Sequence, residues 1–79
     1  MIFSDIRMKE NIRFVEHKHG VNWYAWDWNE VGEMFGLTGS SAGVLAHEVH
    51  ESHPEAVHEL GGYLAVDYAR LAAETVEAA

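Results

Sequence analysis

"VNWYAWDW", residues 21–28, is the stretch that decides the fold, because its aromatic side chains recur at every second position. A period of two is that of an extended strand, and aromatic residues favour strands. Tyr24, Trp26 and Trp28 then share one face of the strand, and Trp23 points to the other face. Since a lone Trp on the second face of a small sheet would be poorly covered, we expect Trp23 at a subunit interface.

The segments around this strand predict a second strand, a loop and a short helix. Residues 12–17 alternate as a strand does, and Gly20 separates them from residues 21–28. The glycine-rich residues 29–41 predict a flexible loop around Met34 and Phe35. After a short buried strand at 42–46, residues 47–52 predict a helix that ends before Pro54, because the residue before proline avoids helical geometry.

The last third of the chain predicts a hairpin followed by a helix. Gly61 and Gly62 lie between two strand-like runs and can supply the positive φ of a two-residue turn. Asp67 is a suitable N-cap for a final helix. One stripe of that helix is apolar and should pack on a partner chain; it consists of Tyr68, Leu71, Ala72, Thr75 and Val76. The order of these elements predicts an α+β fold.

Size and composition set limits on the class of protein. The 79 residues predict a single domain (1–79) near the lower limit for one hydrophobic core, and there is no cysteine to staple it. Because 48% of the residues are hydrophobic, we expect part of that surface to face another chain. The net charge of −8 argues against nucleic-acid binding, and no apolar run is long enough to span a membrane.

Six histidines raise the hypothesis of a metal site, which the spacing does not favour. His47, His50 and His53 are three residues apart, whereas the zinc-protease pattern H-E-x-x-H needs four. His17 and His19 would share one strand face and would need further ligands. The glycines of residues 36–43 match no phosphate-binding loop. We therefore predict neither a metal nor a cofactor; a small metal-binding protein using His47 and His50 is the weakest hypothesis.

Ser4 and Lys9 are the one pair in the sequence that suggests covalent catalysis. A serine becomes a nucleophile when a base takes its proton, and a lysine can be that base when desolvation lowers its pKa. Spacing alone is weak evidence, because Ser4 or Asp5 could equally cap a short helix while Lys9 stays solvated.

The residues around this pair add a family resemblance. "SDIRMKENI" (4–12) resembles the opening signature of the endosialidase-type intramolecular chaperone domain, the C-terminal module of phage tail spikes and fibres. The signature is roughly S-D-x-R-x-K-x-N-I, and six residues match it: Ser4, Asp5, Arg7, Lys9, Asn11 and Ile12. Three later blocks follow in the family's order, namely "YAWDW" (24–28), "AGVLAHEVHESHPEAV" (42–57) and "YLAVDYARL" (63–71).

This resemblance implies a homotrimer that helps a preceding fibre or spike chain to fold, in the virion tail or in the host cytoplasm during assembly. It also implies a single-turnover self-cleaving serine peptidase with Ser4 as nucleophile, Lys9 as base and Phe3–Ser4 as the scissile bond. For the trimer interface we predict Trp23, Tyr68, Leu71 and Thr75.

Two interpretations of the whole chain stay open. Only three residues precede Ser4 here, so the dyad is expected to have nothing to release and to be inactive in this chain. The domain is then a trimerisation and folding chaperone that retains the dyad. Alternatively, it is a virion structural protein, a trimeric fibre tip, cap or adaptor that stays in the phage tail without cleavage.

Overall fold

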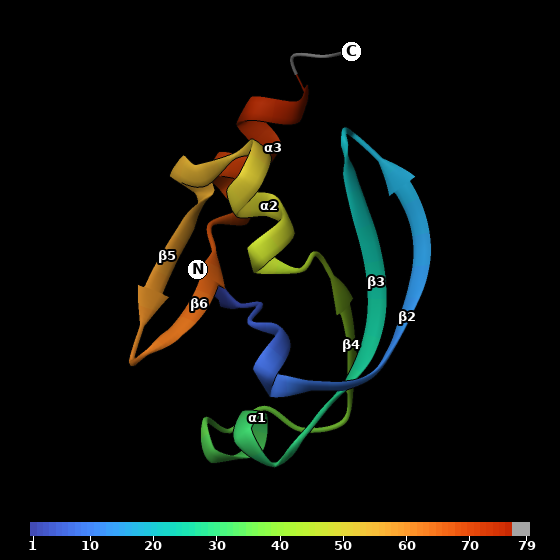
Figure 1. Ribbon diagram of the computed structural model, residues 1–79, viewed down its shortest axis with the longest axis vertical. Coiled ribbons are helices and arrows are strands. Elements are labelled where there is room, and N and C mark those ends of the chain that lie inside the picture. Colours follow the sequence, from blue (N-terminus) through green and yellow to red (C-terminus); the bar gives the residue numbers. More distant parts are fainter. Residues whose placement is uncertain (77–79) are drawn as a thin grey trace.

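The protein folds as two small antiparallel sheets with helices between and beside them. The computed structural model describes residues 1–76, with the backbone alone at 75 and 76. Each sheet has three strands, in the order β1-β6-β5 and β2-β3-β4. In Figure 1, helix α2 lies between the two sheets, α1 lies at one end of the molecule, and α3 lies at the other end. The predicted α+β class is confirmed.

The larger sheet is built on the aromatic strand. β3 covers Val21–Trp28, as predicted, and β2 covers Lys9–Lys18, which is longer than expected at both ends. Between them, His19 and Gly20 both have positive φ, 58° and 78°, which is the geometry of a two-residue hairpin turn. β4, Ser40–Gly43, pairs with the other edge of β3. The predicted strand at 42–46 is therefore displaced towards the N-terminus.

The smaller sheet joins the two ends of the chain. β5 (Val57–Leu60) and β6 (Tyr63–Val66) form the predicted hairpin, and Gly61 and Gly62 take the positive φ of its turn. β1, Ile2–Phe3, pairs antiparallel with β6, so that Phe3 lies opposite Ala65 and Ile2 opposite Val66. The residues directly before Ser4 are thus part of a sheet.

The helices confirm two sequence predictions and correct a third. α2 covers Ala46–Ser52 and ends before Pro54, and α3 covers Tyr68–Val76 with the Asp67 side chain accepting from the Arg70 amide. The expected flexible loop at 29–41 was wrong in part, because it contains helix α1, Glu30–Met34. The Asn29 side chain caps this helix by accepting from the amides of Val31 and Gly32. Two 3₁₀ turns, Ile6–Met8 and Pro54–Ala56, complete the chain.

The core has two parts. The first core cluster lies around α2 and α3, and the second core cluster is formed by Met8, Trp26 and Trp28. The buried members of the first are Val21, Val44, Ala46, Val49, Ala56, Val66 and Leu71. Side chains of the small sheet, Phe3 and Tyr63, pack against the second cluster. The two sheets are therefore joined by packed side chains as well as by the chain itself.

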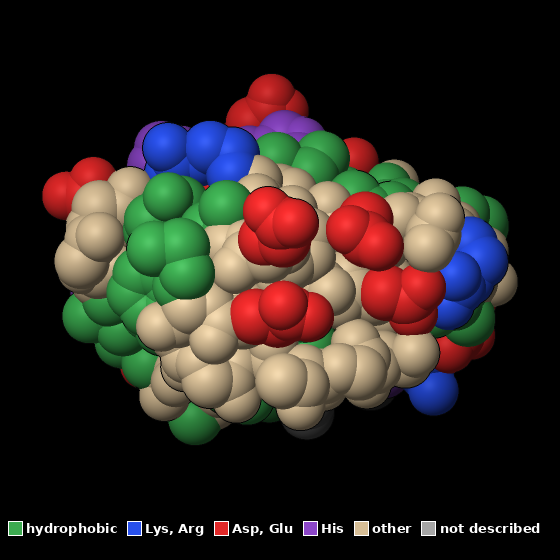
Figure 2. Space-filling model, turned by 90° about the horizontal axis from the view of Figure 1, so that it is seen from below, with side chains coloured by type: hydrophobic (Ala, Val, Ile, Leu, Met, Phe, Trp, Pro, Cys, Tyr) green, Lys and Arg blue, Asp and Glu red, His purple; other side chains and the backbone are tan. Residues whose placement is uncertain are grey.

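The α1 end of the molecule is acidic. Glu30 and Glu33 lie in the first turn of α1, and Figure 2 shows acidic side chains grouped on this face beside hydrophobic ones. Part of the net charge of −8 is therefore concentrated at this end.

Candidate active site

Ser4 lies where the chain crosses from the small sheet to the large one. Its amide donates to the Leu64 carbonyl at 3.0 Å, and its own carbonyl accepts from the Ala46 amide at 2.9 Å. The Ser4 side chain is completely buried, and its hydroxyl donates to the carbonyl of Val44. Because Val44 lies in the return crossover from β4 to α2, Ser4 is held by both connections between the sheets.

Lys9, the first residue of β2, brings its amine to the same point. Lys9 Nζ lies 3.1 Å from Ser4 Oγ, 3.0 Å from the Ser4 carbonyl oxygen and 3.0 Å from the Val44 carbonyl oxygen. Only 5% of the Lys9 surface is exposed. A charged ammonium has three N–H donors, and the three oxygens accept one each. The structure thus brings together the two residues that the sequence predicts as a dyad.

Trp26 covers the amine from the remaining side. Lys9 Nζ lies 3.6 Å from the centre of the Trp26 ring, and Trp26 packs edge-on against Trp28. An ammonium is attracted to the face of an indole, so this contact orients the amine without supplying a negative charge. The Trp26 Nε1 group is buried and has no hydrogen-bond partner among the described residues.

Burial sets the acidity of the amine. Desolvation lowers the pKa of Lys9 from 10.5 to about 7, while the charge of Asp5 acts in the opposite direction. The oxygens that touch Nζ are neutral carbonyl and hydroxyl oxygens, which stabilise the charge less than a carboxylate would. A large share of the Lys9 side chains is therefore neutral near pH 7, as a general base must be.

Asp5 directly follows Ser4, and its hydrogen bonds are structural. Its carboxylate accepts from the Arg7 guanidinium at 2.7 and 3.0 Å, from the Arg7 amide at 2.9 Å and from the Leu64 amide at 2.9 Å. Burial alone would raise the pKa of Asp5, but these hydrogen bonds outweigh it and hold the pKa at about 2. Asp5 therefore ties the crossover to β6 as a permanent anion.

Comparison with known proteins identifies the family of the chain. A family model described as the chaperone of endosialidase matches residues 4–58, which begins at Ser4 and ends inside β5. The chain belongs to the chaperone of endosialidase family. Membership sets this chaperone domain in the context of phage tail-spike assembly. No curated protein and no solved structure matches the chain significantly.

Two parts of the site were missed by sequence reasoning. Val44 takes part through its backbone carbonyl, which no side-chain pattern can reveal. Trp26 was predicted only as one member of an aromatic strand face, and that period-two pattern does place it on the inner side of β3. Its contact with Lys9 could not be predicted from the sequence, because it depends on the register of β2 against β3. That register sets Lys9 opposite Trp28.

The residues predicted for a trimer interface make contacts within their own chain. The Trp23 ring lies 6.4 Å from the Tyr68 ring, and its Nε1 donates to the Lys18 carbonyl. The Tyr68 hydroxyl accepts from the Val44 amide at 3.2 Å. Leu71 is only 2% exposed, so a partner chain would meet little of it, and the Thr75 side chain lies outside the described residues. Their role between chains stays a prediction.

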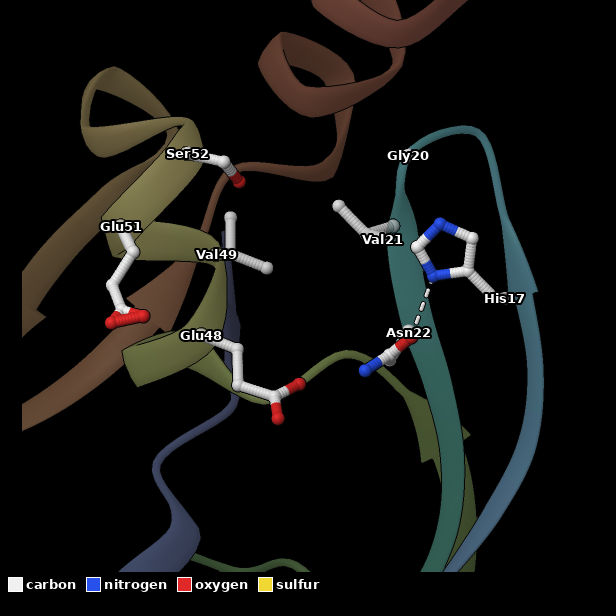
Figure 3. Close-up of a pocket in the computed structure, with 8 residues that line it drawn as sticks. All are labelled: His17, Gly20, Val21, Asn22, Glu48, Val49, Glu51 and Ser52. Atoms are coloured by element: carbon white, nitrogen blue, oxygen red, sulfur yellow. Dashed lines mark hydrogen bonds between the residues drawn. The ribbon is translucent and has the colours of Figure 1, made fainter.

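The histidines are not gathered into a metal site. Within residues 1–76, no group of three or more His, Asp or Glu side chains is placed to hold an ion. His17 instead shares a hydrogen bond with Asn22 beside a pocket of about 260 Å³ between α2 and the β2–β3 hairpin (Figure 3). Glu48 in this pocket already accepts from the Tyr24 hydroxyl. Ser4 and Lys9 are not among the residues that line it.

None of the helices in the described part of the chain has the length and apolar character needed to cross a bilayer.

Proposed function

We propose that this domain is a trimerising intramolecular chaperone that aligns the fibre or spike chain fused in front of it and then cuts the Phe3–Ser4 bond. The observation that carries the proposal is the buried contact of 3.1 Å between Lys9 Nζ and Ser4 Oγ. Family membership supports the chaperone role, and the site supports the cleavage.

The proposed reaction begins with neutral Lys9. The lysine lone pair takes the Ser4 hydroxyl proton, and Ser4 Oγ attacks the carbonyl carbon of Phe3. The C–N bond then breaks, and the Ser4 nitrogen receives the proton back from Lys9, which leaves an ester between the Phe3 acyl group and Ser4 Oγ. Water hydrolyses the ester to a Phe3 carboxylate and a free Ser4 hydroxyl. Nucleophile and carbonyl belong to adjacent residues, so proximity supplies much of the rate.

The backbone around the bond is held for this attack. The Ser4 amide points towards β6 and donates to the Leu64 carbonyl. Phe3, the residue before it, lies opposite Ala65. In an antiparallel pair, alternate residues direct their N–H and C=O groups to opposite sides of the strand. The Phe3 carbonyl therefore faces away from β6. The attack on it does not require any hydrogen bond between β1 and β6 to break.

A trimer is supported by the apolar side chains left on the surface of one chain. Phe14 and Val15 on β2 are 60% and 56% exposed. Val15 lines a groove together with Trp23 and Tyr24, and the Phe14 ring packs on Tyr24. Exposed aromatic and β-branched residues on one strand are typical of a surface that another chain covers.

The test of cleavage is the mass of the chain itself. The sequence alone led us to expect an inactive dyad in this chain, but the buried contact between Lys9 Nζ and Ser4 Oγ favours activity. The purified wild-type chain, incubated at pH 8, should therefore lose residues 1–3 and yield a product that begins at Ser4. Ser4→Ala should stay intact, whereas the control Ser52→Ala, at the end of α2, should cleave at the wild-type rate. A wild-type chain that stays intact would overturn the cleavage, and a mass in solution of one 8.9 kDa chain would overturn the trimer.

A second candidate function is a virion structural protein that never cleaves. The hydroxyl of Ser4 donates to Val44 and not to Lys9, and the amine donates to three oxygens. In that state the pair is a buried tie between the crossovers. This candidate predicts the intact chain in purified particles, in multiples of three, by quantitative mass spectrometry; its absence from particles would count against it.

A further inference from the structure

The residue before the proposed cut packs on one aromatic side chain from a distant part of the chain, and a second aromatic side chain supports the first. The Phe3 ring lies 5.1 Å from the Phe35 ring, and Phe35 lies 5.4 Å from Tyr63 in an edge-on arrangement. Phe35 directly follows α1, and Tyr63 begins β6. Three segments therefore form one row of aromatic rings that begins at Phe3, the residue whose backbone carbonyl would be attacked.

We propose that Phe35 and Tyr63 form a subsite that selects an aromatic residue immediately before the scissile bond and positions its carbonyl for Ser4. This inference rests on the proposed cleavage. Phe35 contacts the Phe3 ring directly and Tyr63 packs behind Phe35, so both act as positioning residues that do not touch the reacting atoms.

The short strand β1 explains why such a subsite is needed. Two residues pair with β6, and a pairing of this length gives little stability by itself. The ring contacts add to it, since each favourable aromatic pair contributes beyond the area that it buries. Ser4 Oγ is held in place by its contacts with Val44 and Lys9. Displacement of Phe3 would therefore move the Phe3 carbonyl relative to a fixed Ser4 Oγ.

The subsite is connected to the residues beside the nucleophile. The Arg7 guanidinium lies 4.6 Å from the centre of the Tyr63 ring and is paired with Asp5 at 2.7 Å. The same guanidinium donates to the Gly62 carbonyl at 3.0 Å. Arg7 thus fixes the Tyr63 side of the subsite to the residue that follows Ser4.

Strand geometry limits the selection to one position. Side chains alternate along β1, so Ile2 points away from the Phe35 ring, and it is 55% exposed. Position 2 should therefore tolerate any residue, whereas position 3 should require a ring. This contrast separates a subsite from a general apolar requirement.

The experiment compares rates of tripeptide loss by mass spectrometry. Phe3→Ala and Phe35→Ala should each slow cleavage about three- to tenfold, the rate equivalent of losing an aromatic pair. Phe3→Tyr should restore the rate, and Ile2→Ala should not change it. Met34→Ala is the matched control, because Met34 ends α1 directly before Phe35 and is 81% exposed.

The double variant Phe3→Ala with Phe35→Ala should be no slower than either single variant, since each removes the same contact. Additive losses, or equal losses at positions 2 and 3, would overturn the subsite. If the wild-type chain does not cleave, the proposed cleavage fails. Hydrogen exchange of the Ser4 amide then tests whether the Phe35 ring holds Phe3 and β1 in place. Faster exchange in Phe35→Ala than in Met34→Ala supports it, and unchanged exchange overturns it.

Discussion

The two ends of β2 carry a lysine each, and the two lysines have very different surroundings. At the beginning of the strand, Lys9 is buried under Trp26 and surrounded by three oxygen acceptors. At the other end, Lys18 is exposed next to the His19-Gly20 turn, and its backbone carbonyl accepts from Trp23. The same residue type on the same strand is therefore a buried amine at one end and a solvated charge at the other.

The difference arises from the part of the fold that each end meets. The beginning of β2 lies against the second core cluster and the two crossovers, whereas its far end leaves the core with the hairpin. Desolvation lowers the pKa of Lys9 because water is excluded there by Trp26 and by the backbone of residues 4 and 44. The chemistry of the lysine is thus a property of the surrounding fold.

The largest contrast should come from removing each amine. Lys9→Met should reduce cleavage by at least a hundredfold, because a general base contributes about 10²–10⁴ to a rate. Lys18→Met should cleave normally. The fold should survive Lys9→Met, since the Ser4 carbonyl keeps its Ala46 donor and the Val44 carbonyl keeps its Ser4 donor. Circular dichroism checks the fold, and a cleaving Lys9→Met chain would remove lysine from the mechanism.

The pH dependence should reveal the same contrast. With the Lys9 pKa at about 7, the cleavage rate should fall about tenfold per pH unit below 7 and level off above it. Between about 7 and the ordinary value of 10.5, the unfolded chain binds more protons at Lys9 than the folded chain does. The free energy of unfolding should therefore rise with pH across this window.

Denaturant titrations of the wild type and of Lys9→Met at several pH values measure how the free energy of unfolding changes with pH. The increase in the free energy of unfolding with pH should be smaller in Lys9→Met than in the wild type, and it should be the same as in the wild type in Lys18→Met. A cleavage rate that is flat between pH 5 and pH 8 would contradict a neutral-lysine base.

Two glycines of the large sheet, Gly43 at the end of β4 and Gly20 in the β2–β3 turn, test the packing around the site. At Gly43, an added Cβ would collide with the Tyr68 hydroxyl and approach Trp26 Cη2 to 3.1 Å. Gly43→Ala should therefore cost about 1–3 kcal/mol of stability and displace the ring that covers Lys9. Gly20 has open space around it, and Gly20→Ala should cost only roughly 1 kcal/mol, from its φ of +78°. Thermal unfolding measures the loss of stability in each variant. Equal losses in Gly43→Ala and Gly20→Ala would contradict the packing argument.

The smallest effect is expected at the exposed end of the strand. His17→Ala removes a hydrogen bond to Asn22 on the surface and should change stability by less than about 0.5 kcal/mol. Chemical denaturation with and without zinc would check this value. A larger loss, or a stabilisation by zinc that His17→Ala abolishes, would show that the histidines near this turn do more than face solvent.

Much of the fold could be predicted from local sequence, and the exceptions have local causes. β3, the Gly61-Gly62 hairpin and the Asp67-capped helix were predicted because periodicity, turn chemistry and capping act over a few residues. α1 was missed because its glycines masked the Asn29 cap. β1 has only two residues, and its pairing with β6 links opposite ends of the chain, which no local pattern can show.

The site was predictable only in part for the same reason. The signature in residues 4–12 pointed to Ser4 and Lys9, and the family model includes them. Their contact with Val44 depends on the backbone of a residue 35 to 40 positions away. The aromatic ring over Lys9 depends on the register of β2 against β3. These features follow from three-dimensional packing and not from residue types.

The position of Ser4 at the two crossovers has a consequence for the order of events during assembly. Ser4, Lys9 and the Val44 carbonyl that both contact belong to three segments that meet only when both sheets have formed and docked. A chain with one sheet missing would lack the Val44 acceptor, the Trp26 cover or the Leu64 anchor, and its lysine would remain hydrated and charged. Under the proposed function, the cut is therefore a checkpoint that only a finished domain can pass. Under the same proposal, the geometry alone would prevent premature separation of an unfolded client.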